Sequence, residues 1–262
     1  MVMKERGVSK TKVQELFVLD GGSIELDKSS LTFGHNQGVR IRVPIPIYLI
    51  KTEEGYILYD TGWSPDLVPL LGALGYNPQI SEDQVLPKCL EKVGVSAKDI
   101  KKVIISHLHV DHAGGLAFFP NAEIIVQKDE YSYAFRPHSF GALAYNLADF
   151  NHPSFNWNII DGDKVIMPGL SVVLANGHTP GTQALVIDLP ETGVFIICSD
   201  CCYTSQNLTE EVIPGIVWNP VLALHSIKKL KTLGELLGGQ VLPNHDIDFW
   251  NNSLKKSPES YK

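Results

Sequence analysis

The segment SHLHVDHAGG, residues 106 to 115, constrains this chain most, because it gathers metal-binding side chains at one point. These side chains are His107, His109, Asp111 and His112. Imidazole and carboxylate groups are good ligands for zinc and related transition metals. In an extended segment, alternation points His107 and His109 to the same side. A turn after them would let Asp111 and His112 face a second ion beside the first.

So short a segment cannot close two metal sites, so further ligands must come from elsewhere in the chain. Three polar residues each follow an apolar run that is typical of a strand, as His107 follows Val103 to Ile105. They are His178 after Ser171 to Leu174, Asp200 after Val194 to Cys198, and His245 after Gln240 to Leu242. Strand ends at one sheet edge are a common place for chemistry, which groups these residues with the first cluster. This placement alone leaves the role of each one open.

The remaining apolar runs predict a mixed α/β sandwich, in which short strands are interspersed with helices. Further strands are predicted at Glu15 to Leu19, ended by a Gly21-Gly22 turn, and at Ile41 to Leu49, Tyr56 to Tyr59, Glu123 to Val126 and Ala184 to Ile187. Helices are predicted at Glu82 to Val93, Asp129 to Phe135 and Pro220 to Leu237. Asn219 caps the last helix and Gly238-Gly239 ends it. Its predicted buried stripe is Leu222, Ile227, Leu230, Leu233 and Leu237.

Composition excludes several classes of protein. A length of 262 residues suits a single domain spanning residues 1–262. A net charge of −7 argues against a nucleic-acid partner. No apolar run approaches the roughly 20 residues that a membrane span needs, and Met1 to Gln14 lacks the apolar core of a signal peptide. The four cysteines (Cys89, Cys198, Cys201 and Cys202) are too few for a disulfide scaffold, so we expect a reducing, cytoplasmic location.

The segment from Ser106 to Gly115 resembles the signature of the metallo-β-lactamase superfamily. The resemblance runs from about Phe17 to His245, and Asp60-Thr61-Gly62 is similar to the family's early strand-end motif. It implies a four-layer αββα sandwich with two metal ions at one edge. The ligand set that it implies is His107, His109 and His178 for one ion, Asp111, His112 and His245 for the other, and Asp200 as the bridge. Zinc is the default ion, and manganese, iron or cobalt also suit these ligands.

Two local features resemble the N-acyl homoserine lactonases, the quorum-quenching branch of this superfamily. One is SHLHxDHAGG itself, and the other is Tyr203, three residues after Asp200. A phenol there could donate a hydrogen bond to developing negative charge. One departure is Val110, where such lactonases often carry an aromatic residue, and it leaves the acyl preference open. The stretches Phe17 to Ser23 and Asn244 to Asp246 resemble the wider lactonase branch, which includes 4-pyridoxolactonase.

The resemblance implies a hydrolase that opens the lactone ring of N-acyl homoserine lactones. A hydroxide bridging the two ions would attack the carbonyl, Tyr203 would stabilise the oxyanion, and Asp111 would pass a proton to the leaving ring oxygen. The alternatives are a 4-pyridoxolactonase-like or other lactonase and a glyoxalase II-like thioesterase. The few residues after His245 leave little room for the glutathione-binding extension of the thioesterase. Outside enzymes, the alternative is a metal-dependent binding module.

Two apolar segments broken by proline and glycine are candidates for the substrate pocket, Trp63 to Tyr76 and Tyr131 to Trp157. Core packing or a dimer contact is the alternative for both. The resemblance and these apolar segments suggest a homodimer that acts on a small-molecule lactone. The spacing Cys198-x-x-Cys201 is interpreted as core packing, and Asp60-Thr61-Gly62 as support for a ligand histidine.

Overall fold

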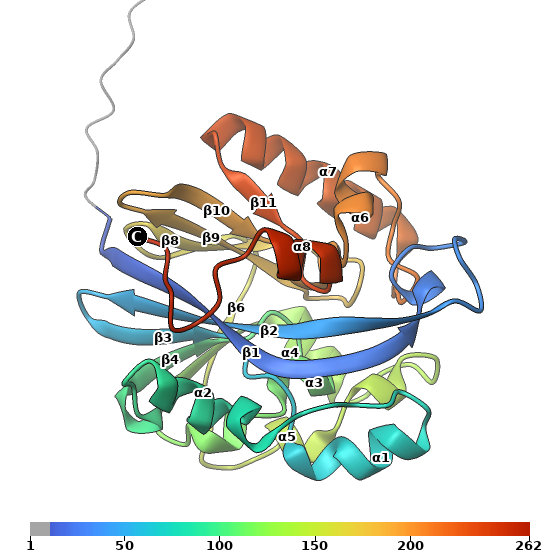
Figure 1. Ribbon diagram of the computed structural model, residues 1–262, viewed down its shortest axis with the longest axis horizontal. Coiled ribbons are helices and arrows are strands. Elements are labelled where there is room, and N and C mark those ends of the chain that lie inside the picture. The colour runs from blue at the N-terminus through green and yellow to red at the C-terminus, as the bar shows by residue number, and fades with distance from the viewer. Residues whose placement is uncertain (1–10) are drawn as a thin grey trace, which may run out of the picture.

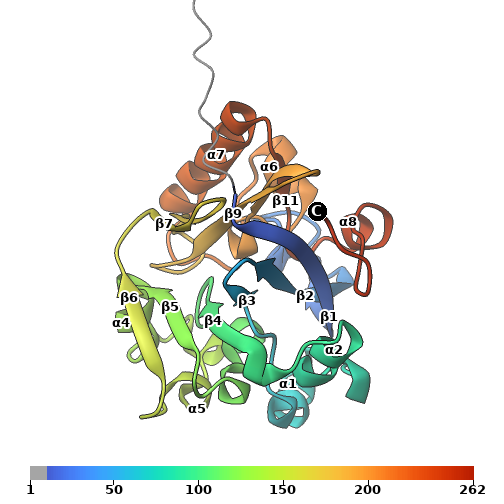
Figure 2. The ribbon, with the colours of Figure 1, turned by 90° about the vertical axis from the view of Figure 1, so that its left-hand side faces the viewer.

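The structure is a computed structural model that describes residues 11–262, and it contains two mixed β-sheets packed face to face (Figure 1). Most of the stretch Met1 to Gln14 lies outside the described residues. Helices cover both outer faces, so the layers run helix, sheet, sheet, helix, as Figure 2 shows from the side. The predicted αββα sandwich is therefore confirmed.

The first sheet has six strands in the order β1-β2-β3-β4-β5-β6. β1 to β3 pair antiparallel, whereas β3 to β6 run parallel. The bounds are β1 Val13–Asp27, β2 Arg40–Thr52, β3 Gly55–Tyr59, β4 Ile100–Ile104, β5 Glu123–Gln127 and β6 Asn156–Ile160.

The second sheet has five strands in the order β11-β10-β9-β8-β7. Its strands are β7 Lys164–Met167, β8 Leu170–Leu174, β9 Gln183–Leu189, β10 Gly193–Ile197 and β11 Gln240–Leu242. β8 and β10 both pair antiparallel with β9, and β11 pairs parallel with β10, so β8, β10 and β11 all point the same way. Their carboxyl ends therefore lie at one edge of the sheet.

The helices α1 to α7 form the two outer layers, and α8 lies at the edge between the sheets, with Trp250 in the core between them (Figure 1). α1 to α5 lie over the first sheet, and α6 and α7 lie over the second (Figure 1). The bounds are α1 Val68–Ala73, α2 Leu86–Lys92, α3 Val110–Ala113, α4 Lys128–Ala134, α5 Leu147–Phe150, α6 Ser205–Glu210, α7 Pro220–Leu237 and α8 Ile247–Asn252. Short 3-10 turns occupy Lys28–Ser30, Pro65–Leu67, Glu82–Gln84, Ala97–Asp99, Leu116–Phe118, Ala142–Ala144 and Ser199–Cys201. Within the described part of the chain, none of these helices is long and apolar enough to span a membrane.

Burial of apolar side chains between the layers holds the sandwich together. One cluster fills the space between the sheets and includes Tyr48, Tyr59, Leu185 and Ile197. A second lies between the first sheet and its helices, and a third lies between the second sheet and α7. All four cysteines are buried and free, and Cys198, Cys201 and Cys202 belong to the third cluster, as predicted for core packing.

The predicted turn at Gly21-Gly22 is wrong. β1 continues to Asp27, and the two glycines form a bulge between Asp20 and Ser23. Gly22 has a φ of +93°, and a Cβ on Gly21 would lie 2.8 Å from the carbonyl oxygen of Ile45. Glycine is therefore required here for a bulge against β2, which the local pattern does not distinguish from a turn.

The predicted helices were partly correct. The predicted helix Glu82 to Val93 is broken at Val85, which is extended, and restarts as α2 with Pro87 in its first turn. α7 has its predicted bounds, but its buried stripe differs. Ile227 and Leu230 are fully buried, whereas Leu222 and Leu233 are half-buried and Leu237 is exposed. Small residues take their place because α7 lies close to the sheet: Ala223, Ser226 and Gly234.

The predicted cap of α7 is confirmed. The side-chain oxygen of Asn219 accepts hydrogen bonds from the amides of Val221 and Leu222, both at 3.1 Å. The backbone amide of Asn219 donates to Gly177 at 2.8 Å, next to His178. The cap therefore joins the longest helix to the loop that carries a predicted ligand.

Replacing Asn219 with alanine removes this cap, and we expect the free energy of unfolding to fall by about 1 kcal/mol. Asn219→Asp keeps an acceptor and should remain near wild type. Urea denaturation followed by circular dichroism measures both variants. Equal stability of Asn219→Ala and the wild type would contradict this role of the side chain.

Candidate metal centre

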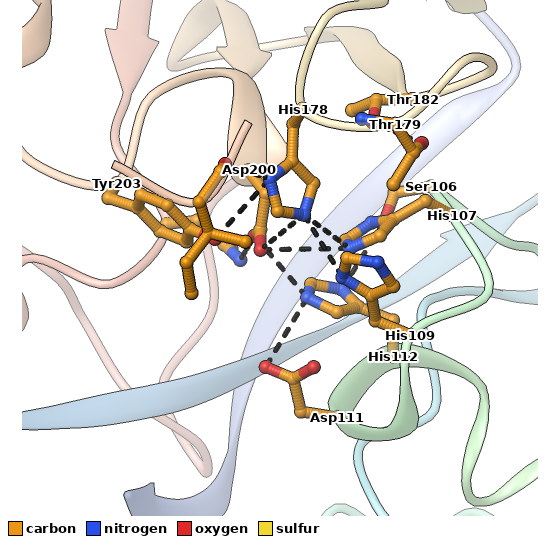
Figure 3. Close-up of polar contacts among 12 residues, drawn as sticks. Ser106, His107, His109, Asp111, His112, His178, Thr179, Thr182, Asp200 and Tyr203 are labelled. Carbon is orange, nitrogen blue, oxygen red and sulfur yellow. Dashed lines mark hydrogen bonds and ion pairs between the residues drawn. The ribbon is translucent and has the colours of Figure 1, made fainter. Parts of the chain in front are cut away.

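The seven predicted ligand side chains converge where strands of both sheets end and form two adjacent groups. Figure 3 labels all of them except His245. One group is His107, His109, His178 and Asp200, and the other is Asp111, His112 and His245. Within each group the candidate ligand atoms lie within 4.8 Å of one another. His107 follows β4, His178 follows β8, Asp200 follows β10 and His245 follows β11. The expectation that strand ends collect these residues is confirmed.

The carboxylate of Asp200 lies between the two groups. Its Oδ2 is 3.4 Å from Nε2 of His178 and 3.6 Å from Nε2 of His107. Its Oδ1 is 3.1 Å from Nε2 of His245 and 3.3 Å from Nε2 of His112. Each oxygen thus faces a different group, which is the arrangement that a bridging ligand needs.

The spacing of the nitrogen atoms fits metal coordination. Nε2 of His178 lies 3.1 Å from both Nε2 of His107 and Nδ1 of His109. Ligand atoms at about 2.0–2.1 Å from a tetrahedral ion stand roughly 3.3 Å apart. In the second group, Oδ2 of Asp111 lies 3.6 Å from Nε2 of His112. That Nε2 atom is buried and has no hydrogen-bond partner among the described residues, so a metal ion would satisfy it.

The outward-facing nitrogen atoms of three histidines have hydrogen-bond acceptors. Nδ1 of His112 lies 2.8 Å from a carboxylate oxygen of Asp60. Nδ1 of His178 faces the carbonyl of Ile216 at 2.8 Å, and Nδ1 of His245 faces that of Pro44 at 2.7 Å. An N–H donated outward leaves the lone pair of Nε2 directed inward, as a metal ligand requires.

Asp60 orders the first ligand loop as well as His112. It accepts hydrogen bonds from the amide and the hydroxyl of Ser106 at 2.7 Å and 2.8 Å. Asp60 has a φ of +63°, an unusual left-handed conformation for a residue other than glycine. The structure therefore gives Asp60 the supporting position predicted for Asp60-Thr61-Gly62.

Two glycines allow the segment after His112 to approach the backbone of residues 61 to 64 closely. A Cβ on Gly114 would lie 2.2 Å from the backbone nitrogen of Ser64, and one on Gly115 would lie 2.4 Å from the carbonyl oxygen of Thr61. In turn, the amide of Thr61 donates to the carbonyl of His112 at 2.7 Å. The Gly-Gly pair of the motif is thus a packing requirement.

Burial and neighbouring charges shift the pKa values of the candidate ligands in different directions. Burial, together with the imidazoles around them, lowers the pKa of His107 and His109 well below the ordinary value, so both are neutral near pH 7. Burial alone would raise the pKa of Asp200, but His112, His245 and His107 outweigh it and hold that pKa well below its ordinary value. Burial alone would lower the pKa of His112 and His245, but Asp200 and Asp111 outweigh it and raise both above the ordinary value. The centre therefore combines neutral imidazoles at His107 and His109 with an ionised Asp200 that favours the charged form of His112 and His245.

Tyr203 lies beside the centre with its hydroxyl 3.4 Å from Nδ1 of His178. That nitrogen faces the carbonyl of Ile216, so as a donor it leaves the phenolic proton free for another acceptor. Burial, followed by the charges of Asp200 and Asp111, raises the pKa of Tyr203 well above its ordinary value. The hydroxyl therefore keeps its proton and can donate a hydrogen bond into the adjoining cavity.

A cavity of about 380 Å³ opens onto the centre. His109, Asp111, His178, Asp200, Tyr203 and His245 line its polar end. Its walls are largely apolar and include Leu26, Val43, Leu71, Val110, Phe140, Ile216 and Trp218. A second cavity, of about 480 Å³, meets only His245 among these polar residues and is lined mainly by α6, α8 and the residues next to them.

The two predicted pocket segments divide between cavity and core. From Trp63 to Tyr76, Leu71 and Tyr76 line the cavity, whereas Leu70 and Leu74 are exposed. From Tyr131 to Trp157, the residues Tyr133, Phe140 and Tyr145 line the cavity. The other aromatic residues of that segment belong to the cluster between the first sheet and its helices: Tyr131, Phe135, Phe150, Phe155 and Trp157, the last of them in β6.

Some contributions to the site had no sequence signal. Leu26 and Val43 come from β1 and β2, far along the chain from the metal-binding motif. The carbonyl oxygens of Pro44 and Ile216 are backbone atoms, which any residue type could supply. Glu130 is fully buried against both ligand loops. The sequence indicates this burial only through its spacing of four residues from Ala134, which is buried on the same short helix.

Comparisons with known proteins agree with this geometry. Residues 40–256 match the model of the metallo-beta-lactamase superfamily. The chain is 33% identical to the N-acyl homoserine lactonase AttM of Azorhizobium caulinodans, over 94% of this chain and 98% of that one. It is 35% identical to the N-acyl homoserine lactonase AiiA of Bacillus thuringiensis subsp. kurstaki, over 90% and 94%.

A solved N-acyl homoserine lactone hydrolase, with the product N-hexanoyl-L-homoserine bound at its catalytic metal centre, superposes with a TM-score of 0.87. That structure is 34% identical and covers 96% of this chain and all of its own. Together with the two groups of candidate ligands, these matches place this protein among the metal-dependent hydrolases. The chain belongs to the metallo-beta-lactamase superfamily.

Proposed function

We propose that this protein is a dinuclear zinc enzyme that opens the lactone ring of N-acyl homoserine lactones. The observation that carries the proposal is the position of the paired ligand groups, at the polar end of a largely apolar cavity. A lactone ring would lie against the polar end and an acyl chain along the apolar walls. Relatives at 33% and 35% identity that are named N-acyl homoserine lactonases support the same substrate class.

The geometry supports the following ligand roles. His107, His109 and His178 would hold one ion, and Asp111, His112 and His245 the other. Asp200 would bridge them, one oxygen to each. When bound, such a pair of ions supplies a nucleophile at neutral pH and polarises the ester carbonyl.

Two side chains of the cavity would act on the substrate. The Tyr203 hydroxyl keeps its proton and would donate a hydrogen bond to the carbonyl oxygen as negative charge develops there. Asp111 is the least buried of the candidate ligands, and its carboxylate faces the cavity. It would pass a proton to the ring oxygen as the ester bond breaks.

The first prediction concerns substrate class and metal. Protein purified without chelator should hydrolyse N-acyl homoserine lactones, lose the activity on chelation and regain it when zinc is added. The measurement is a hydrolysis panel of short- and long-chain acyl homoserine lactones, 4-pyridoxolactone, γ-lactones and S-lactoylglutathione, with metal content read on the same sample. Activity confined to 4-pyridoxolactone would instead indicate a 4-pyridoxolactonase-like enzyme, and activity confined to S-lactoylglutathione would indicate a glyoxalase II-like thioesterase. Metal-loaded protein inert on the whole panel would favour a binding module.

The second prediction concerns Tyr203. Tyr203→Phe should keep the bound metal and lower kcat by about 10- to 1000-fold, because one donor to the oxyanion is lost. Tyr133→Phe is the matched control, since Tyr133 lines the same cavity and its hydroxyl accepts from the amide of His138 at 3.2 Å. The control should retain most activity. Unchanged turnover of Tyr203→Phe would remove its hydroxyl from the mechanism.

A further inference from the structure

Glu130 is a fully buried carboxylate on α4 that touches no candidate metal ligand atom yet connects both loops that carry the first ligand group. Its Oε1 accepts from the amide of Leu108 at 2.9 Å, between His107 and His109. Its Oε2 accepts from the hydroxyl of Thr179 at 2.5 Å and from the amide of Gly181 at 3.2 Å, just after His178. One side chain thus fixes the distance between two segments more than 60 residues apart.

The same carboxylate holds a wall of the cavity. The hydroxyl of Tyr145 donates to Oε1 of Glu130 at 3.1 Å. The ring of Tyr145 packs edge-to-face on His109, with ring centroids 4.6 Å apart. Because its hydroxyl points toward Glu130, Tyr145 presents its ring to the cavity and restricts the orientation of the His109 imidazole.

Packing leaves little freedom for a different arrangement. A Cβ on Gly181 would lie 2.5 Å from the backbone nitrogen of Glu130, so the loop after His178 is pressed directly onto α4. The second ligand group is held by other contacts, since His112 faces Asp60 and His245 faces the carbonyl of Pro44. Asp60 also accepts from Ser106, next to His107, so it supports both groups, whereas the hydrogen bonds of Glu130 reach the loops of the first group alone.

We infer that Glu130 is a positioning residue for the His107, His109 and His178 group alone, and that it sets the affinity of that one metal position. The inference rests on the proposed dinuclear centre. Both oxygens of Glu130 accept from backbone amides, which are obligatory donors. Glutamine has the same shape but only one oxygen, so its NH₂ would face the amide of Leu108 or that of Gly181. One ligand loop must then shift, and His107 and His109 would separate from His178.

The test is metal retention in Glu130→Gln, with Asp149→Asn as the matched control. Asp149 is a buried carboxylate on α5 that accepts a hydrogen bond from the side-chain amide of Asn146. It makes no hydrogen bond to the loops of His107 or His178 among the described residues. On dialysis against graded chelator, Glu130→Gln should lose half of its metal at about 10- to 100-fold lower chelator strength than wild type and keep the other half. In the cobalt-substituted protein, the visible spectrum of one site should change and that of the other should stay. Asp149→Asn should match wild type in both readouts.

A second pair of variants keeps the test decisive if Glu130→Gln fails to fold. Thr179→Val removes one donor to Glu130 and should show the same selective metal loss to a smaller degree, whereas Thr179→Ser keeps the hydroxyl and should behave as wild type. Loss of both metals together, or retention equal to wild type in Glu130→Gln and Thr179→Val, would overturn the inference. Neither readout needs a substrate. Wild-type protein that binds no metal would instead refute the proposed function.

Discussion

The rest of the site depends on the contacts of the Asp200 carboxylate with the histidines on either side of it. That carboxylate is buried, its two oxygens face different groups of imidazoles, and the charge of those groups outweighs the cost of burying it. A buried carboxylate without partners would be strongly unfavourable, and imidazoles packed this closely would repel one another once protonated. The centre is therefore favourable only as a unit, in which Asp200 is ionised, His107 and His109 are neutral, and the pKa values of His112 and His245 are raised.

The fold supplies what this unit requires. Parallel strands bring Asp60 and His107 to one edge of the first sheet, and the common direction of β8, β10 and β11 brings His178, Asp200 and His245 to the facing edge of the second. Neither sheet alone carries a complete group. Packing of the two sheets across Tyr48, Tyr59 and Leu185 thus determines whether the ligands meet. Stability of the core and competence of the site are linked through this interface.

Much of the site could be predicted from sequence because its signals are local or follow strand ends. The cluster from His107 to His112 is contiguous, and His178, Asp200 and His245 each follow an apolar run. The cap and bounds of α7 were equally local. The bulge at Gly21-Gly22 was misread because its cause, the carbonyl of Ile45, lies on another strand. The stripe of α7 was misread because periodicity does not reveal that Gly234 sits against Val241. The strands β6 and β7 were not predicted. β6 begins at the end of the segment Tyr131 to Trp157, which was interpreted as pocket lining, core packing or a dimer contact.

Contacts between distant segments were also beyond sequence reasoning, and they include the supports of both metal groups. Asp60 supports His112 and Glu130 supports the loops of His107 and His178, yet the sequence offers only a short motif for the first and no motif for the second. This division suggests that the first position of the centre can be tuned separately. A change at Glu130 would weaken the first position and leave the contacts of the second in place, whereas a change at Asp60 would reach both.

The most direct measurement is a crystal structure of the metal-loaded protein with anomalous diffraction recorded at the zinc edge. We predict two peaks about 3.5–4 Å apart, one on each side of Asp200, with each carboxylate oxygen contacting a different ion. A single peak, or two ions with Asp200 bound to only one of them, would contradict the account of a carboxylate-bridged dinuclear centre.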